Sequence, residues 1–256
     1  MTEDIEKQLE EKIKEIREKD KMLFEQSKNS AMGEMISLIA HQWRQPLNEL
    51  SIIVQQTKMK FDKDELTKNI MNDYNNKSLD LINKMSDTID DFRYFFEPQT
   101  TKNYLNLKSC VDKVLSLIDG LFKRHSIDLI IDINSNITIL GYENEFSQIL
   151  LNFINNSKDA FESKKIEKPF IEIRAEELDN KIIKMTISDN AGGINEDIIQ
   201  KIFNPYFTTK FTSQGTGLGL YMTKLIIENN MGGKVSVENF QDGTRFSIYF
   251  NAFNNK

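Results

Sequence analysis

One histidine of this chain lies in a polar run whose residue types could support nucleophilic chemistry. The run is Ala40-His41-Gln42-Trp43-Arg44-Gln45-Pro46-Leu47-Asn48. A neutral imidazole has a free ring nitrogen, and an unperturbed histidine is mostly neutral at pH 7. Pro46 follows His41 by five residues, where it removes a helical hydrogen bond and bends the helix. A polar residue at the edge of a helical core is the plainer interpretation of His41. The second histidine, His125, is expected to be an exposed turn residue.

Four further clusters, all after residue 150, have residue types that suit nucleotide binding. They are residues 151–160 (LNFINNSKDA), 189–194 (DNAGGI), 202–210 (IFNPYFTTK) and 214–220 (QGTGLGL), with Gly243 and Thr244 after them. Asn152 and Asn156 are four residues apart, so they share one face of a helix. Asp189 follows a predicted strand, and the glycines after it allow a ligand to approach the backbone. The glycine-rich turn before a helix favours phosphate. Singly, each cluster is more often an ordinary polar face, loop or tight turn.

Long helices must position His41. Leu9, Ile16 and Leu23 recur every seven residues on an otherwise charged segment, which predicts a coiled coil over residues 1–30. A single solvated helix is the alternative. The helical pattern continues to about residue 61. A second helix follows, with apolar residues spaced by three and four, and ends before Pro98; these residues are Ile82, Met85, Ile89, Phe92 and Phe96. A two-helix hairpin has too little core to fold alone, so we expect a homodimer with a four-helix bundle.

A different pattern begins near residue 100. Strands are predicted at 127–133, 170–175, 182–188, 234–238 and 245–250, and helices at 107–122, 143–163, 196–202 and 218–230. Ten of the 11 glycines lie in this part. The fold class is therefore α+β: a coiled coil (1–30), a helical hairpin (31–99) and a two-layer α/β sandwich (100–256).

The composition excludes several functional classes. Lysine and arginine total 33 against 39 acidic residues, a net charge of −6, so no basic excess exists to bind nucleic acid. The single cysteine, Cys110, excludes an internal disulfide and a cysteine-built zinc site. Apolar runs are too short to span a bilayer. We expect a cytoplasmic chain whose parent could be membrane-anchored, with its sensor domain outside this sequence.

In their order and spacing, the four clusters closely resemble the Bergerat-type ATP-binding domain shared by histidine kinases, type II topoisomerases, Hsp90 and MutL. The resemblance covers residues 100–253 and implies ATP and Mg²⁺. It implies that Asn156 binds Mg²⁺ and that Asp189 accepts a hydrogen bond from the adenine amino group, supported by Thr244. Other nucleotide-binding candidates lie in the same clusters; they are Asn152, Asp159, Gly193, Lys210 (from a lid), Gly215, Gly217 and Gly219. Ala191 departs from the usual Asp-x-Gly-x-Gly pattern.

Asn152 bears on the type of reaction. ATPases of this superfamily resemble one another in having a glutamate four residues before the Mg²⁺ asparagine, where it activates water. Asparagine has no carboxylate to accept that proton. The γ-phosphate is then left for another nucleophile, which favours a kinase.

The run around His41 resembles the phosphoacceptor box of sensor histidine kinases of two-component systems. The resemblance implies autophosphorylation of His41 and transfer of the phosphoryl group to an aspartate of a response regulator. Gln42 departs from the usual acidic residue: its carbonyl can fix the imidazole tautomer, but it is not a base. Gln45 stands where relatives position water for dephosphorylation.

Two other functions remain open. Gln42 and Ala191 favour a catalytically weak dimeric scaffold with a nucleotide-sensing domain. The domain family also contains chaperone-like and repair ATPases, against which Asn152 argues.

Overall fold

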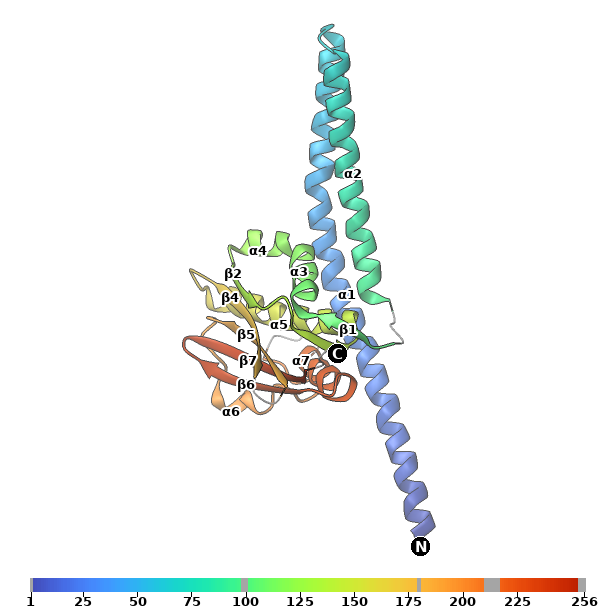
Figure 1. Cartoon of the computed structure of the whole chain (residues 1–256), viewed down its shortest axis with the longest axis vertical. Coiled ribbons are helices and arrows are strands. Elements are labelled where there is room, and N and C mark those ends of the chain that lie inside the picture. The colour runs from blue at the N-terminus through green and yellow to red at the C-terminus, as the bar shows by residue number, and fades with distance from the viewer. Residues whose placement is uncertain (1, 98–100, 179–180, 210–216, 253–256) are drawn as a thin grey trace.

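The computed structural model of the chain describes residues 2–97, 101–178, 181–209 and 217–252. Only the backbone is described at residues 2–4, 24, 27, 28, 31, 34, 35, 37, 38, 41, 42, 87, 88 and 90–96. Two long antiparallel helices form a hairpin, and a mixed α/β domain lies against its side (Figure 1).

The hairpin consists of α1 (Thr2–Asp62) and α2 (Lys68–Phe96). α1 is one continuous helix that runs through residue 30 and contains Pro46. The connection is short; Asp64 has a positive φ of 56°, and the Glu65 amide donates to the Lys60 carbonyl. α2 ends at Phe96, two residues before Pro98. Both predicted helices are confirmed.

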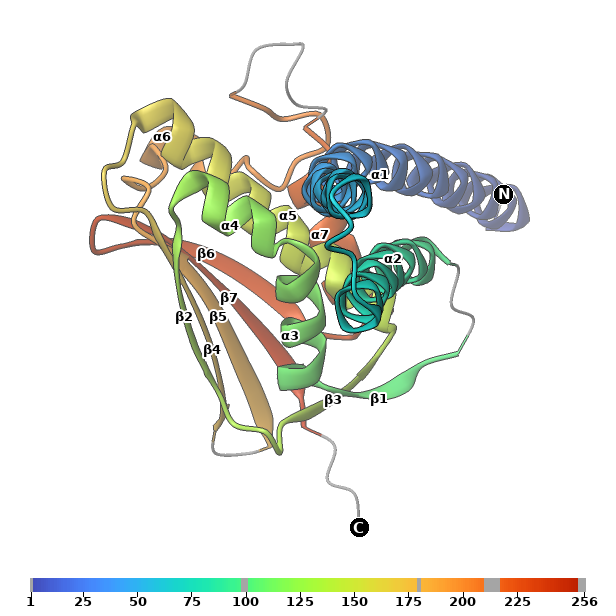
Figure 2. The ribbon, with the colours of Figure 1, turned by 90° about the horizontal axis from the view of Figure 1, so that it is seen from above.

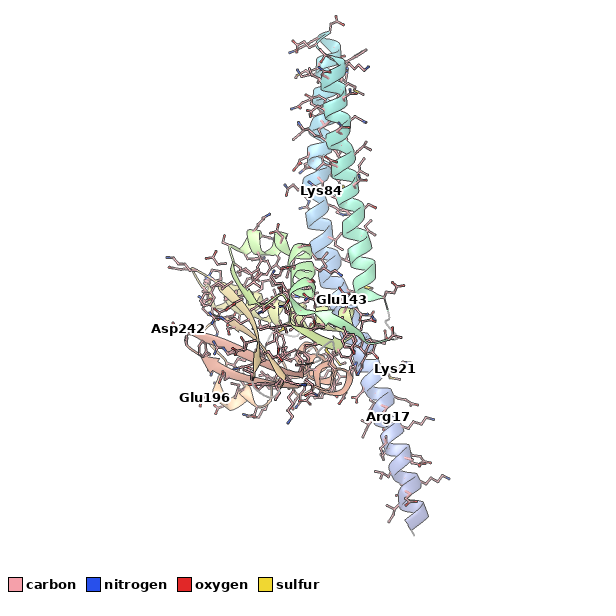
Figure 3. All side chains as sticks on the ribbon, in the orientation of Figure 1. Arg17, Lys21, Lys84, Glu143, Glu196 and Asp242 are labelled. Atoms are coloured by element: carbon pink, nitrogen blue, oxygen red, sulfur yellow. The ribbon has the colours of Figure 1, made fainter. Side chains whose placement is uncertain are left out.

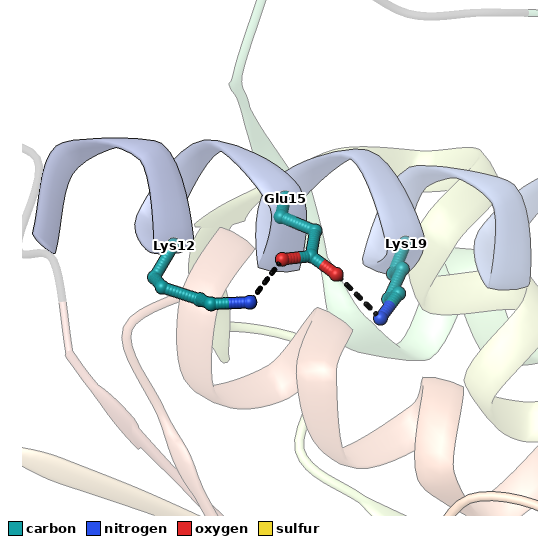
Figure 4. A network of polar contacts seen from close by, with 3 residues as sticks. All are labelled: Lys12, Glu15 and Lys19. Atoms are coloured by element: carbon teal, nitrogen blue, oxygen red, sulfur yellow. Dashed lines mark hydrogen bonds and ion pairs between the residues drawn. The ribbon is translucent and has the colours of Figure 1, made fainter. Parts of the chain in front are cut away.

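Much of the first half of α1 extends beyond the α/β domain, and the side chains of Arg17 and Lys21 project from the helix (Figure 3). Charged side chains support the helix here. Lys12 and Lys19 both donate to the carboxylate of Glu15, which lowers the pKa of Glu15 to about 2 (Figure 4). These i,i+3 and i,i+4 pairs stabilise a solvated helix. The apolar seam residues of this half, such as Leu9 and Ile16, are exposed in the single chain.

The α/β domain contains two sheets. A short antiparallel pair joins β1 (Asn103–Asn106) to β3 (Thr138–Gly141). The main sheet has the order β2-β4-β5-β7-β6, in which β2 is parallel to β4 and the other neighbours are antiparallel. Its strands are β2 (Asp128–Ile133), β4 (Phe170–Leu178), β5 (Ile182–Asp189), β6 (Lys234–Phe240) and β7 (Gly243–Asn251).

Helices cover one face of this sheet (Figure 2). They are α3 (Leu107–Leu117), α4 (Asp119–His125), α5 (Glu143–Lys164) and α7 (Gly219–Leu225), which continues as the π-helical turn η1 (Ile226–Asn230). Alternate residues of the central strands, such as Ile173 and Met185, are fully buried in the same core as Phe146 and Phe153 of α5. This two-layer arrangement confirms the predicted α+β fold.

Three details differ from the sequence expectation. The helix expected over 107–122 is broken at Ile118 into α3 and α4. α6 (Glu196–Ile199) is one turn long instead of seven residues. The pair β1 and β3 was not expected, because four-residue strands show too little alternation to be recognised.

Among the described residues, no helix combines the length and the apolar character that a bilayer crossing requires.

Candidate active site

α5 carries the two asparagines that the sequence placed on one helix face, and both are half-buried. The Asn152 amide nitrogen donates to the carbonyl oxygen of Gly219 and to the hydroxyl of Thr223, at 3.1 Å each. Asn152 therefore joins α5 to the first turn of α7. Asn156 lies one turn farther along α5. Asp159 follows it and pairs with Lys158 at 3.0 Å.

Asp189 lies at the end of β5 and is buried, with 8% of its surface exposed. Its Oδ2 accepts a hydrogen bond from the Ser157 hydroxyl at 2.6 Å. Its Oδ1 accepts from the backbone amides of Ala191 (2.9 Å) and Thr244 (3.1 Å). Thr244 thus contacts the carboxylate through its backbone. A carboxylate offers about four lone-pair sites, so three donors leave capacity for an amino group of a ligand.

The turn after Asp189 is fixed by its neighbours. Gly192 and Gly193 have positive φ values of 73° and 68°, which favour glycine, whereas Ala191 is not among the residues with positive φ. This explains why the turn accepts an alanine at the position where the family motif has its first glycine. The side chain of Asn239 binds both the amide and the carbonyl of Ile194, at 2.7 Å each.

The described part of the glycine-rich turn begins at Gly217 and leads into α7. Gly217 has a φ of 66°, and a Cβ on it would approach the backbone of Tyr206 to 2.5 Å. The two ends of the loop between them therefore meet, and only glycine allows this approach. Gly219 opens α7 beside Asn152. Two predicted phosphate-binding residues, Lys210 and Gly215, lie outside the described residues.

His41 lies in α1, five residues before Pro46. The side chains of His41 and Gln42 are outside the described part. Gln45 is exposed and donates to Glu49 at 3.2 Å. The indole nitrogen of Trp43 is buried, and it has no hydrogen-bond partner among the described residues.

The expectation for His125 was wrong. It ends α4, is half-buried, and its Nδ1 lies 3.1 Å from the Glu162 carboxylate. The reason is that the end of α4 packs near the end of α5, a contact between helices that the local sequence does not show.

A polar contact connects the α/β domain to the long helix. The Tyr221 hydroxyl, in the first turn of α7, donates to the Asp20 carboxylate at 2.8 Å. Burial and the neighbouring carboxylate raise the pKa of Tyr221 to about 12. α7 lies beside α1 in both views of the ribbon (Figure 1, Figure 2). Asp20 and His41 are separated by about 31 Å of helix at 1.5 Å per residue.

Sequence reasoning missed three residues of this region. Asn239 and Lys164 hold the turn after Asp189, and Tyr221 binds α1. Lys164 gave one weak signal, since it directly follows the helix predicted over 143–163, which carries Asn156. Asn239 and Tyr221 gave none, because their partners are distant in the sequence.

Comparison with known proteins agrees with this geometry. Residues 141–253 match the family described as histidine kinase-, DNA gyrase B-, and HSP90-like ATPase. Sporulation kinase A of Bacillus subtilis is 27% identical over 93% of this chain and 38% of its own length. The two-component sensor PprA of Pseudomonas aeruginosa is 24% identical over 91% of this chain and 26% of its own length. The chain thus spans well under half of these curated relatives.

Solved structures show the same fold. The catalytic domain of histidine kinase ThkA is 28% identical, with a TM-score of 0.53, over 59% of this chain and 96% of that one. ThkA in complex with the response regulator protein TrrA has a TM-score of 0.50 at 24% identity, over 88% of this chain and 63% of that one. Residues 141–253 are thus similar to this ATPase family, and the chain is similar to sensor histidine kinases over most of its length, as its motifs predicted.

Proposed function

We propose that this chain is the catalytic portion of a two-component sensor histidine kinase, an ATP:protein-histidine phosphotransferase. Residues 1–30 form a signalling coiled coil, 31–99 carry the phosphoacceptor His41, and 100–256 bind ATP. A ring nitrogen of His41 attacks the γ-phosphorus while the bond to the bridging β-phosphate oxygen breaks and ADP leaves. The phosphoryl group then passes to a carboxylate oxygen of an aspartate of a response regulator, and the His41 imidazole is released.

The role of Asn152 carries this proposal. Its carboxamide occupies the position from which an acidic residue would activate water, and its amide nitrogen is engaged by Gly219 and Thr223. A carboxamide has no proton-accepting group near neutral pH, so hydrolysis lacks a base here. The γ-phosphate is retained for a histidine.

The donors and acceptors of the site fit a nucleotide. The Asp189 carboxylate keeps a free lone pair for the adenine amino group beside its three protein donors. Asn156 offers a carboxamide oxygen, a hard ligand of the kind that Mg²⁺ accepts along with phosphate oxygens and water. Mg²⁺ held there would neutralise charge on the phosphates.

The phosphoacceptor and the nucleotide site lie on different elements. Tyr221 is bound to Asp20, about 31 Å along α1 from His41. Transfer therefore requires the ATP-binding domain to leave this contact and move along the bundle toward His41.

The hairpin also supports pairing of two chains. Large apolar side chains of α1 and α2 are exposed in the single chain, such as Leu47, Ile52, Val54, Phe61 and Leu79. A second copy would cover them in a four-helix bundle. The response regulator would dock on this bundle near His41, and an upstream sensor would act through the coiled coil.

Labelling with γ-labelled ATP and Mg²⁺ tests the proposal. The wild-type chain should acquire acid-labile, alkali-stable label that His41→Gln lacks. His125→Gln removes the only other histidine and should label normally. Nucleotide binding without labelling of the protein would favour the alternative of a catalytically weak dimeric scaffold. Steady phosphate release that persists in His41→Gln would identify an ATPase.

A further inference from the structure

The ammonium group of Lys164 binds the turn that follows Asp189. Lys164 is the last residue of α5, and its Nζ donates to the carbonyl oxygens of Ala191 (2.7 Å) and Gly193 (2.9 Å). The intervening Gly192 lies against the same side chain, since a Cβ built on it would be 3.2 Å from Nζ. One cation thus holds both carbonyls of the turn.

The Ala191 residue connects this lysine to Asp189. Its amide donates to Asp189 Oδ1 at 2.9 Å, and its carbonyl accepts from Lys164. Ala191 is buried, with 2% of its surface exposed. Hydrogen bonds from a charged donor are stronger than neutral ones. The lysine binds the peptide that follows Ala191, whereas the donating amide lies in the peptide before it, so Lys164 restrains that amide through the backbone of Ala191.

Other contacts fix the remaining sides of this loop. Asn190 accepts from the Phe170 amide and donates to the Lys168 carbonyl, at 2.9 Å each. The Gly192 amide donates to the Asp242 carbonyl at 2.7 Å. Lys164 adds a cation to these neutral contacts, and it reaches the carbonyl oxygen two residues after Asp189 from α5, the helix that carries Asn156.

We propose that Lys164 is a positioning residue for recognition of the adenine base. By holding the carbonyls of Ala191 and Gly193, it keeps the Ala191 amide on Oδ1 of Asp189 and the free lone pair of that carboxylate directed toward the purine amino group. This rests on the proposed function, in which Asp189 binds adenine. A lysine that served only the stability of the domain would affect all nucleotides equally.

The test compares two nucleotides on the full chain. Dissociation constants are measured by calorimetry for ATP and for inosine triphosphate, which has a carbonyl oxygen where adenine has its amino group. The variants are Lys164→Met, which keeps the aliphatic stem, Lys164→Ala and Lys164→Arg. The neighbouring Lys165→Ala is the matched control. Asp189→Asn shows how the two dissociation constants change when the preference for ATP over inosine triphosphate is lost.

We expect the wild type to prefer ATP, and Lys164→Met and Lys164→Ala to weaken ATP binding by about tenfold while inosine triphosphate binding stays unchanged. Lys164→Arg should restore most of the preference, and Lys165→Ala should match the wild type. Unchanged ATP binding, or an equal loss of both nucleotides, would overturn the inference even if a variant is less stable. A wild type without preference would instead overturn the assignment of Asp189, and the inference with it.

Discussion

The side-chain amide of Asn152 lies 3.1 Å from the carbonyl oxygen of Gly219, so the helix of the paired asparagines is bonded to the end of the glycine-rich turn. The same nitrogen donates to Thr223, which is fully buried. One residue therefore ties the helix of Asn156, to which we assign Mg²⁺, to the glycine-rich turn, to which we assign the phosphates. It also stands four residues before Asn156, where our proposal places the missing water-activating base.

Asn152→Ala should remove both hydrogen bonds and leave the hydroxyl of Thr223 without this donor. We expect a loss of about 1–3 kcal/mol in the free energy of unfolding, measured with urea, because buried polar groups lose their partner. ATP affinity should fall as well, because the turn is no longer tied to α5. Full retention of both quantities would show that the contact is dispensable.

Asn156→Ala should abolish Mg²⁺-dependent autophosphorylation, because the variant lacks the carboxamide oxygen assigned to the metal. Binding of ATP without Mg²⁺ should persist, since the contacts of Asp189 are untouched. Asn155→Ala, at the adjacent residue, serves as the control and should label with ATP. Normal labelling of Asn156→Ala would refute the assignment.

Gly243→Ala should prevent correct folding of the ATP-binding domain. A Cβ at this residue would lie 1.6 Å from the carbonyl oxygen of Asp189. The clash is with backbone atoms, which cannot move aside as the end of a flexible side chain could. Gly33→Ala is the contrasting substitution, since nothing lies within 4 Å of its Cβ and it is in the interior of α1. It should stabilise the helix by about 1 kcal/mol. Thermal unfolding of the two variants distinguishes the effects.

Tyr221→Phe should increase the rate of autophosphorylation, because it removes the hydrogen bond that holds α7 at Asp20, far from His41. Tyr249→Phe, on β7, is the control. The Tyr221 pKa is raised to about 12, so the protonated donor persists below pH 10 and is lost only as the pH rises through about 12. A change of pH between 6 and 9 should therefore not reproduce the effect. An unchanged rate in Tyr221→Phe would show that this contact does not restrain transfer.

Glu145→Gln should change how stability depends on pH. Burial raises the pKa of Glu145, and one carboxylate oxygen is buried without a partner among the described residues. A carboxyl group with a raised folded-state pKa favours the folded state while protonated, and this contribution is lost as the pH rises through that pKa. The urea midpoint of the wild type should therefore decline, relative to that of the variant, from pH 4 toward neutrality. Parallel curves would contradict this.

The sequence by itself determined the elements and the chemistry of their faces. Periodicity placed α1, α2 and α5, and the spacing of Asn152 and Asn156 put both on one face of α5. Asp189 at a strand end and Gly217 in a tight turn were also readable, because each role depends on a few neighbouring residues. Where local signals were weak, the prediction failed, as at Ile118, which breaks a helix, and at the four-residue strands β1 and β3.

Only the tertiary structure decided which distant groups meet. Lys164 and Ala191 are 27 residues apart, and Tyr221 and Asp20 are 201 apart, yet both pairs are within hydrogen-bond distance. It also showed that Asn152 binds Gly219 and that His125 pairs with Glu162. The physical reason is that the neighbouring residues in the sequence determine whether a residue lies in a helix or a strand, and on which face. The partner that its side chain contacts depends on how whole helices and strands pack together.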